Sequence, residues 1–298
     1  MAVHRATRPG GRMKLARFTD GGPPQIGVVT EDGLVSLSRA APTIGHDMLG
    51  LIRAWPEFET EARRIGEAGE GVTPIGRARF LAPVPRPGKV MAIGLNYADH
   101  ILEAKAKLPD RQMWFAKAQT SINAPFDPIE IPTEESAVDY EAELVAVVGT
   151  GGRRLSASDS RAAIFGYCVG NDVSERNWQL QSPQWTLGKS FDTHGPIGPW
   201  ITTADEVGDP HTLGIRCFVN GERRQNSNTT NLVFNVWDQV EHLSQAMTLE
   251  AGDLIFTGTP GGIGAAMTPR RYLAPGDQVR VEIDRLGEIE ATCRLALG

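Results

Sequence analysis

Asp139-Tyr-Glu-Ala-Glu-Leu-Val-Ala-Val-Val-Gly149 is the stretch on which the interpretation of this chain depends. It predicts a β-strand, in which side chains two positions apart share a face, so Glu141 and Glu143 point the same way as Val145 and Val147. Glutamates that continue a valine face are expected to be partly buried, and adjacent buried anions are unfavourable unless a cation compensates them. The alternative is an edge strand with a solvated glutamate pair.

A third carboxylate favours the interpretation in which the two glutamates are buried around a cation. Asp172 ends a second apolar strand, Tyr167-Cys-Val-Gly-Asn-Asp172, and polar residues follow it directly. Carboxylates without an obvious histidine partner are the oxygen ligands typical of hard divalent cations. The sequence therefore predicts that Glu141, Glu143 and Asp172 hold Mg²⁺ or Mn²⁺, with Ca²⁺ as a further candidate, rather than zinc.

An acid–base pair is predicted on a short helix over residues 97–107. His100 and Glu103 are three positions apart, so they are neighbours on the helix surface. A carboxylate beside an imidazole raises its basicity, as a base that activates water requires. The alternative is an ordinary surface pair, and the HExxH pattern of zinc proteases is absent.

Two glycine-rich segments, residues 188–192 and 257–264, match no nucleotide-binding motif. Neither contains a P-loop, and residues 149–151 are followed by Arg154 where a dinucleotide motif needs its third glycine. Residues 257–264 are either a plain turn or a loop whose backbone N–H groups approach a carboxylate.

Composition excludes several classes of protein. The net charge of −6 gives no basic surface for nucleic acid, and no run of about 18 apolar residues predicts a membrane span. The three cysteines, Cys168, Cys217 and Cys293, are widely spaced in strand-like segments, which is typical of buried reduced thiols in a cytoplasmic protein. Residues 1–12 are expected to be a disordered tail, with an Arg-rich transit peptide as the alternative.

The chain divides into two parts. Residues 13–83 predict a small α+β domain of three strands and a helix over 47–70, and the proline-rich residues 82–88 mark its end. Residues 84–298 predict a larger domain with many strands and few, short helices. Strands are expected at 90–94, 138–148, 167–172, 213–220, 253–257, 278–284 and 288–295, and helices at 159–165, 174–180 and 235–247. The fold class is α+β, mostly β.

Five motifs, in this order, resemble the fumarylacetoacetate hydrolase family. The resemblance covers about residues 88–296, and residues 13–83 resemble the small N-terminal domain that many bacterial members carry. The motifs are Gly94-Leu-Asn-Tyr-Ala-Asp-His100, Asp139-Tyr-Glu-Ala-Glu-Leu144, Gly166-Tyr-Cys-Val-Gly-Asn-Asp-Val-Ser-Glu-Arg-Asn-Trp-Gln179, Gly188-Lys-Ser-Phe-Asp-Thr193 and Gly252-Asp-Leu-Ile-Phe-Thr-Gly-Thr-Pro260.

The resemblance implies a mixed β-sandwich roll, a homodimer and a Mg²⁺ or Mn²⁺ site at the three carboxylates. It also implies that 2-oxo acids bind through the metal. The residues that match family positions are His100 and Glu103 as a dyad on a mobile lid, Gln179 and Lys189 as catalytic polar and cationic contacts, and Arg176, Thr259 and Gly258 on the substrate side.

Two positions depart from the family pattern. Members often have Lys-Pro where this chain has Lys117-Ala118, and many have Asp where it has Asn177. Both positions are expected near the pocket, so they bear on the identity of the substrate more than on the chemistry.

The resemblance leads us to expect hydrolysis of a C–C bond in a 2,4-dioxo acid, of the acylpyruvate or diketo-deoxy sugar acid type, to pyruvate and a carboxylic acid. In this scheme the cation stabilises the enolate and His100 activates water. The alternative is a decarboxylase or isomerase of a 2-oxo diacid, such as oxaloacetate or 2-hydroxyhepta-2,4-diene-1,7-dioate. A metal-bound 2-oxo-acid binding protein without turnover is a remote third possibility.

Overall fold

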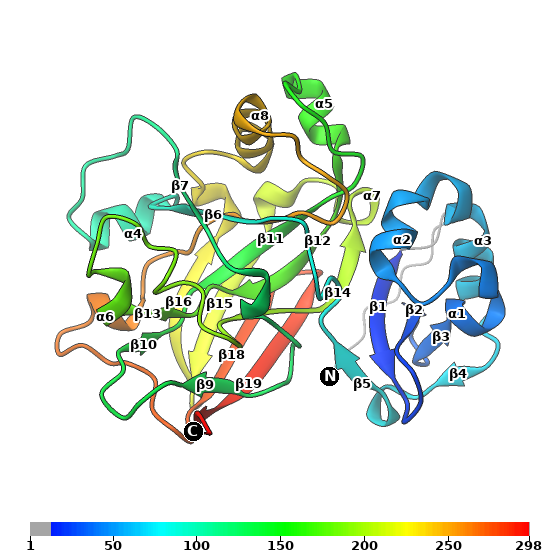
Figure 1. The fold of residues 1–298 in the computed structure, drawn as a ribbon, viewed down its shortest axis with the longest axis horizontal. Coiled ribbons are helices and arrows are strands. Elements are labelled where there is room, and N and C mark those ends of the chain that lie inside the picture. The colour runs from blue at the N-terminus through cyan, green and yellow to red at the C-terminus, as the bar shows by residue number, and fades with distance from the viewer. Residues whose placement is uncertain (1–12, 298) are drawn as a thin grey trace.

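Two β-sheets packed against each other make up most of the computed structural model, which describes residues 13–297 (Figure 1). Helices are short and lie mainly at the edges of the sheets, so the expected α+β, mostly β class is confirmed. The tail expected at residues 1–12 lies outside the described residues. No helix within the described part of the chain is long and apolar enough to cross a membrane.

The larger sheet runs from the N-terminal part of the chain to the centre of the molecule. Its strands, in spatial order, are β4 (Val72–Thr73), β3 (Leu34–Ser36), β2 (Gln25–Val29), β1 (Lys14–Thr19), β14 (Gly195–Thr203), β12 (Ile164–Asn171), β11 (Ala142–Val148), β17 (Leu254–Phe256), β6 (Val90–Gly94) and β7 (Met113–Ala116). Two short strands lie off this path, β5 (Arg79–Leu81) on β1 and β8 (Ile122–Asn123) on β14.

The second sheet packs on the central strands of the first. Its order is β16 (Glu222–Asn228), β15 (Gly214–Val219), β18 (Gln278–Ile283), β19 (Gly287–Leu295) and β9 (Ile129–Ile131). A third, two-stranded sheet pairs β10 (Val138–Asp139) with β13 (Ser174–Glu175). Asn220 and Gly221 form the turn of the hairpin between β15 and β16, and both have the positive φ (51° and 78°) that a two-residue hairpin turn requires.

The helices are α1 (Leu37–Ala40), α2 (Met48–Arg53), α3 (Trp55–Ala68), α4 (Ala98–Glu103), α5 (Ala157–Ala162), α6 (Arg176–Gln179), α7 (Ala204–Val207) and α8 (Val236–Ala246). The helix predicted over 47–70 is two helices, because Pro56 follows the break at Ala54 and starts a new helix. The helix predicted over 159–165 begins earlier, with Ser156 as its N-cap, and ends before β12.

Strand β14 is absent from the sequence predictions, although it joins the two parts of the large sheet. It pairs with β1 of the N-terminal part on one side and with β12 on the other (Figure 1). Residues of both parts, such as Leu15 and Val147, also belong to one hydrophobic cluster. The division at residue 83 stays a prediction, and the sheet and core are continuous across it.

Strand β11 is buried on both faces. Leu144 and Ala146 pack toward the second sheet, whereas Val145 and Val147 pack in the cluster shared with the N-terminal part. The three cysteines are likewise buried and form no disulfide, as expected. Burial raises the pKa of the Cys168 and Cys293 thiols to about 12.

Candidate active site

One antiparallel register brings the three predicted ligands together. Val138 pairs with Glu175 in the small sheet and Ala142 pairs with Asn171 in the large one, so the same register continues between them. This register sets Glu141 opposite Asp172, and the backbone N–H of Asp172 donates to the carbonyl of Glu141 at 2.9 Å. The predicted strand 138–148 is therefore interrupted at residues 140–141 without losing its pairing.

Glu141, Glu143 and Asp172 are all buried, and one carboxylate oxygen of each lies within 4.8 Å of the others. Ion pairs surround them. Lys189 Nζ lies 2.7 Å from both Glu141 Oε2 and Asp172 Oδ2, and Lys117 Nζ lies 2.7 Å from Asp172 Oδ1. The sequence indicated Lys117 only as a departure from the family pattern and did not predict that it contacts a ligand.

The neighbouring glutamates have opposite electrostatic environments. Burial acts to raise the pKa of Glu141, but the positive charges of Lys189 and Arg176 outweigh it and lower that pKa to about 2. Burial and the negative charges of Asp172 and Glu141 raise the pKa of Glu143 well above its usual value. The site thus holds negative charge that its own cations do not fully compensate, and its oxygen donors fit a divalent cation such as Mg²⁺ or Mn²⁺.

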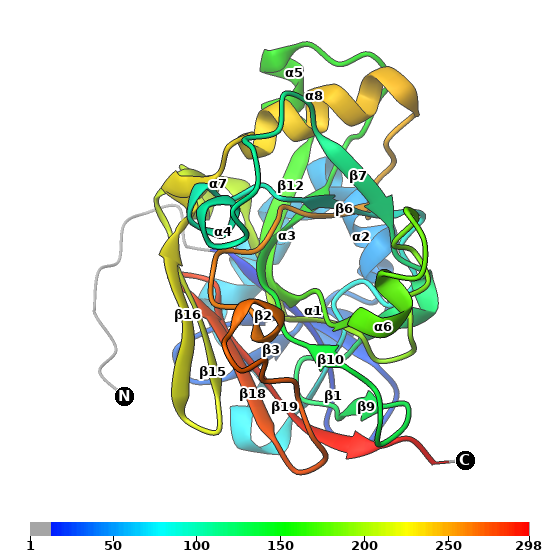
Figure 2. The same cartoon turned by 90° about the vertical axis from the view of Figure 1, so that its left-hand side faces the viewer.

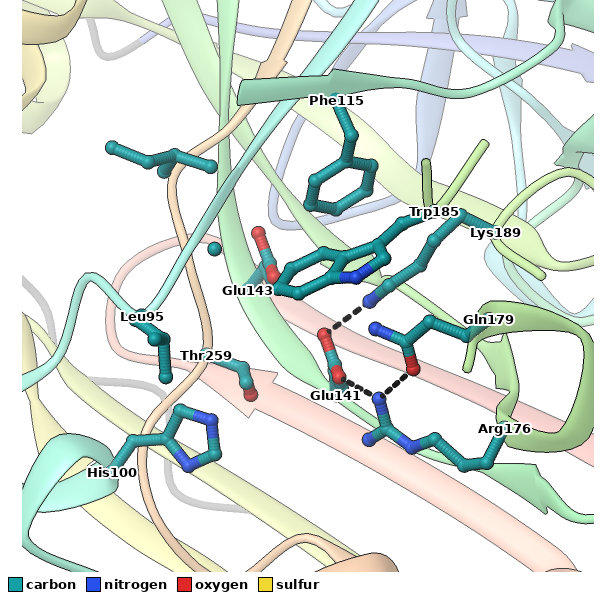
Figure 3. A pocket seen from close by; sticks show the side chains of 12 residues that line it. Leu95, His100, Phe115, Glu141, Glu143, Arg176, Gln179, Trp185, Lys189 and Thr259 are labelled. Carbon is teal, nitrogen blue, oxygen red and sulfur yellow. Dashed lines mark hydrogen bonds and ion pairs between the residues drawn. The ribbon is translucent and has the colours of Figure 1, made fainter. Parts of the chain in front are cut away.

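A cavity of about 60 Å³ opens onto Glu141 and Glu143. Figure 3 shows Lys189, Gln179 and Arg176 on one side of Glu141 and Thr259 and His100 on the other, with Phe115 and Trp185 above. The lining residues are Ile93, Gly94, Leu95, His100, Phe115, Glu141, Glu143, Arg176, Gln179, Trp185, Lys189 and Thr259. One wall is therefore apolar and the other carries both charges and hydrogen-bond donors.

The glycine-rich loop 257–264 supports the site through its backbone. The N–H of Gly258 donates to Glu143 Oε2 at 2.8 Å, and the substrate-side role of Gly258 stays a prediction. Gln225 Nε2 donates to Thr259 Oγ1 at 2.9 Å, so the hydroxyl proton of Thr259 is left to donate into the cavity. Gln225 is a site residue that the sequence analysis missed.

Helix α4 places His100 at the cavity, across from α6 (Figure 2). His100 Nδ1 lies 3.5 Å from Glu103 Oε2, so the predicted dyad is adjacent but long for a hydrogen bond. Both oxygens of Glu103 accept the N–H of Gly262 at 3.0 Å. Burial acts to raise the pKa of Glu103, but His100 and the N–H of Gly262 lower it further than burial raises it.

Arg176 and Gln179 reach the cavity from α6. Arg176 Nη1 donates to Gln179 Oε1 at 2.8 Å and lies 2.7 Å from Glu141 Oε1. The opposite edge of the guanidinium, Nε and Nη2, donates to Asp139. Asp139 was not among the predicted site residues, although it begins the stretch that decides the interpretation.

The arrangement can stabilise negative charge on a small oxo acid. Three carboxylates can hold a divalent cation, Lys189, Gln179 and Thr259 present hydrogen-bond donors to the same cavity, and His100 is placed to exchange a proton. A cation and donors of this kind stabilise an enolate, which is the intermediate when a proton or a carbon group leaves the carbon next to a carbonyl.

Comparisons with known proteins agree with this chemistry. The model of the fumarylacetoacetate (FAA) hydrolase C-terminal domain matches residues 89–294. The chain is 42% identical over 258 residues to the mitochondrial oxaloacetate tautomerase Fahd2a of Rattus norvegicus, a match that covers 86% of this chain and 82% of that protein.

Solved structures resemble the whole described fold. A putative HpcE protein from Mycobacterium smegmatis has a TM-score of 0.85 and 36% identity, covering 96% of this chain and 100% of that one. Maleylpyruvate hydrolase from Sphingobium sp. SYK-6, in complex with manganese(II) and pyruvate, has a TM-score of 0.79 and 31% identity, with the same coverage.

Proposed function

Because this chain belongs to the fumarylacetoacetate hydrolase family, we propose that it is a divalent-metal-dependent enzyme that interconverts the keto and enol forms of a 2-oxo diacid such as oxaloacetate. The observation that carries the proposal is the buried triad Glu141, Glu143 and Asp172, whose two glutamates line a cavity together with His100 and Lys189. The similarity to an oxaloacetate tautomerase supports this reaction over the hydrolysis that we expected first.

The proposed cofactor is Mg²⁺ or Mn²⁺, held by Glu141, Glu143 and Asp172. When bound, the ion supplies Lewis acidity that stabilises an enolate oxygen at C2 of the substrate. Manganese in the structurally similar maleylpyruvate hydrolase supports this choice of ion.

The chain's own side chains would move the proton. His100 Nδ1 faces Glu103, so Nε2 is the ring nitrogen left to take the proton from C3. Transfer of a proton to the C2 oxygen would then complete the enol, and the reverse transfers would regenerate the keto form. Lys189 Nζ, the amide of Gln179 and the hydroxyl of Thr259 would donate to the substrate's oxygens as negative charge develops there. The apolar wall of Phe115 and Trp185 would limit water at the reacting carbon.

Hydrolysis of a 2,4-dioxo acid remains a second candidate, because the same base could activate water instead of taking a proton from carbon. The pairing of His100 with Glu103 and the similarity to maleylpyruvate hydrolase favour it.

We also retain the homodimer and the cytoplasmic location as predictions, and sedimentation velocity would test the dimer.

Three assays with Mg²⁺ or Mn²⁺ separate the candidates. Tautomerisation is followed by the ultraviolet absorbance of enol-oxaloacetate, decarboxylation by CO₂ release, and hydrolysis by pyruvate formed from acylpyruvates. We expect accelerated tautomerisation that EDTA abolishes and added metal restores. Activity that is insensitive to chelation, or acylpyruvate cleavage with no effect on tautomerisation, would contradict the proposal.

Substitution of His100 tests its role. His100→Ala should lower kcat about 10²–10⁴-fold, as for other lost acid–base groups, and leave Mn²⁺ binding unchanged. The matched control is His242→Ala, which removes an exposed histidine of α8 and should leave kcat unchanged. Wild-type turnover in His100→Ala would remove His100 from the mechanism.

A further inference from the structure

We propose that Asp139 and Arg176 form a relay that orients Glu141 and Gln179, so that Arg176 is a positioning residue rather than the clamp of a substrate carboxylate. We call this pair the Asp139–Arg176 relay. The inference deepens the proposed function, because it concerns the same cavity and rests on its use as a metal and oxo-acid site.

Asp139 is fully buried and accepts hydrogen bonds on both oxygens. Oδ1 accepts the N–H groups of Tyr140 at 2.9 Å and Gly264 at 2.8 Å. Oδ2 accepts the N–H of Ala265 at 3.0 Å and, from Arg176, Nε at 3.0 Å and Nη2 at 2.8 Å. A carboxylate that accepts five hydrogen bonds is held rigidly, and it fixes the guanidinium plane in turn.

Arg176 has no free edge with which to clamp a second carboxylate. Its Nε and Nη2 edge is taken by Asp139, and Nη1 is shared between Gln179 Oε1 and Glu141 Oε1. A bidentate clamp needs two parallel N–H groups that point at one carboxylate. The side chain is also buried. Burial acts to lower the pKa of Arg176, but the negative charges of Glu141 and Asp139 outweigh it and raise that pKa above its usual value.

The relay determines which atoms face the cavity. Because Arg176 holds Glu141 Oε1, the other oxygen, Oε2, points toward Lys189 (Figure 3). Because Arg176 can only donate, Gln179 must present Oε1 to it, so the Gln179 amide NH₂ faces the cavity. One ligand oxygen and one substrate-side donor are thus set by the same guanidinium.

The relay also contacts the end of the glycine-rich loop, which contributes Thr259 to the cavity wall. The N–H groups of Gly264 and Ala265, which donate to Asp139, lie at the end of the glycine-rich loop and just after it, six and seven residues beyond the Gly258 that donates to Glu143. Asp139 therefore ties the position of Arg176 to the loop that supports a second metal ligand.

Asp139→Asn distinguishes a relay from a clamp. The variant keeps the shape of residue 139 and leaves Arg176 charged. It removes the carboxylate that accepts the hydrogen bonds of Arg176 Nε and Nη2. A relay predicts that the Kd for Mn²⁺, measured by calorimetry without substrate, rises about 10–100-fold, as for other partners of metal ligands, and that kcat for oxaloacetate falls. A clamp predicts an unchanged Mn²⁺ Kd and an unchanged or lower KM.

Arg176→Met tests the relay by the direction in which it changes the Mn²⁺ Kd. It can replace Asp139→Asn if that variant does not fold. Removal of a positive charge beside the site should tighten Mn²⁺ binding on Coulombic grounds alone. A relay predicts the opposite, weaker Mn²⁺ binding, because Glu141 loses its orientation. In the double variant Asp139→Asn/Arg176→Met, the increase in Kd should be no larger than that of the more affected single variant.

The matched control is Asp253→Asn. Asp253 is a buried carboxylate outside the cavity that also accepts two backbone N–H groups, those of Lys89 and Glu250, at 2.8 Å. It should lower the thermal midpoint but leave the Mn²⁺ Kd unchanged.

The result that would overturn the relay is a wild-type Mn²⁺ Kd in folded Asp139→Asn or Arg176→Met, or multiplicative effects in the double variant. Absence of oxaloacetate turnover in the wild type would instead contradict the proposed function, and the Mn²⁺ titrations would still decide the relay.

Discussion

Gly258 shows how a single residue connects the glycine-rich loop to the metal site. Its φ of 101° is unfavourable for any residue with a Cβ, and an added Cβ would lie 2.7 Å from Asn96 Cβ. Its N–H also donates to Glu143. The backbone must therefore keep this conformation for the ligand to keep its partner.

Gly258→Ala should accordingly weaken Mn²⁺ binding as well as lower stability, as measured by calorimetry and thermal unfolding. Gly221→Ala is the matched control, since Gly221 also has a positive φ (78°) but an added Cβ there meets nothing within 4 Å. The control should cost about 1 kcal/mol through strain alone and leave Mn²⁺ binding intact. Equal effects of the two variants on Mn²⁺ binding would contradict this account.

His194 predicts a specific pH dependence of stability. Burial lowers the pKa of this imidazole to about 3, and Nε2 donates to the Glu130 carbonyl at 2.8 Å in the neutral form. Between about pH 6.5 and 3 the unfolded chain binds a proton here that the folded chain does not, so stability falls as pH falls, by about 1.4 kcal/mol per pH unit.

The measurement is the free energy of unfolding against pH for the wild type and His194→Asn. The variant should have a shallower slope between pH 6.5 and 4, while His46→Asn, which changes an exposed histidine, should keep the wild-type slope. Parallel curves for His194→Asn and the wild type would contradict the role given to burial.

A site residue could be predicted where the pattern of its own segment indicates its role. It could not be predicted where its role depends on which segments pair in the fold. Glu141, Glu143 and Asp172 were found by alternation and by their place at the end of a strand, and the structure brings them together. Asp139 and Gln225 carry no local pattern, because their roles follow from which segments the register sets beside them. Neither role can be read from one segment alone.

Among the elements, β14 could not be predicted from residue propensities. Pro196 and Pro199 lie within it, and proline lacks the N–H that a central strand uses in its ladder. The strand nevertheless pairs with β1, β12 and β8, with an irregularity opposite Tyr167–Val169. The paired strands β11 and β12 were predictable because each is a largely apolar run of strand length.

Helix α4 is held to the glycine-rich loop and to β16 by its own acidic side chains. Glu103 accepts the Gly262 N–H, and Asp99 accepts the hydroxyl of Ser227. We expect Glu103→Ala to speed amide hydrogen exchange of residues 98–106 and to lower kcat, because His100 loses a fixed position. Glu103→Gln, which keeps an acceptor, should have a smaller effect.

Asp110→Ala is the control for this prediction, because Asp110 follows α4 but is exposed and lies 4.0 Å from its nearest cation, Lys107. Its exchange and kcat should match the wild type. If Glu103→Ala exchanges no faster than Asp110→Ala, the contact with Gly262 does not hold the helix.

For the whole molecule, the continuous sheet predicts one cooperative unfolding unit. Leu15 in β1 is fully buried in the cluster shared with β11, and it pairs with Ile201 of β14. Leu15→Ala should destabilise the entire chain by about 2–5 kcal/mol and preserve a single transition in scanning calorimetry.

The control for cooperativity is Ile75→Ala, a truncation at a residue of the same N-terminal part that is 45% exposed. It should change stability by no more than about 0.5 kcal/mol. Two wild-type transitions, of which Leu15→Ala shifts only one, would instead establish independent domains.

The burial of every cysteine makes the native chain a ready background for site-specific labelling. Cys168, Cys217 and Cys293 are inaccessible, and their protonated thiols react slowly with maleimides in water. A fluorophore or spin label attached through Leu102→Cys, at a position 78% exposed on α4, would therefore report on that helix without prior removal of native thiols. Motion beside the cavity could then be recorded in the otherwise unaltered enzyme while metal and substrate are added.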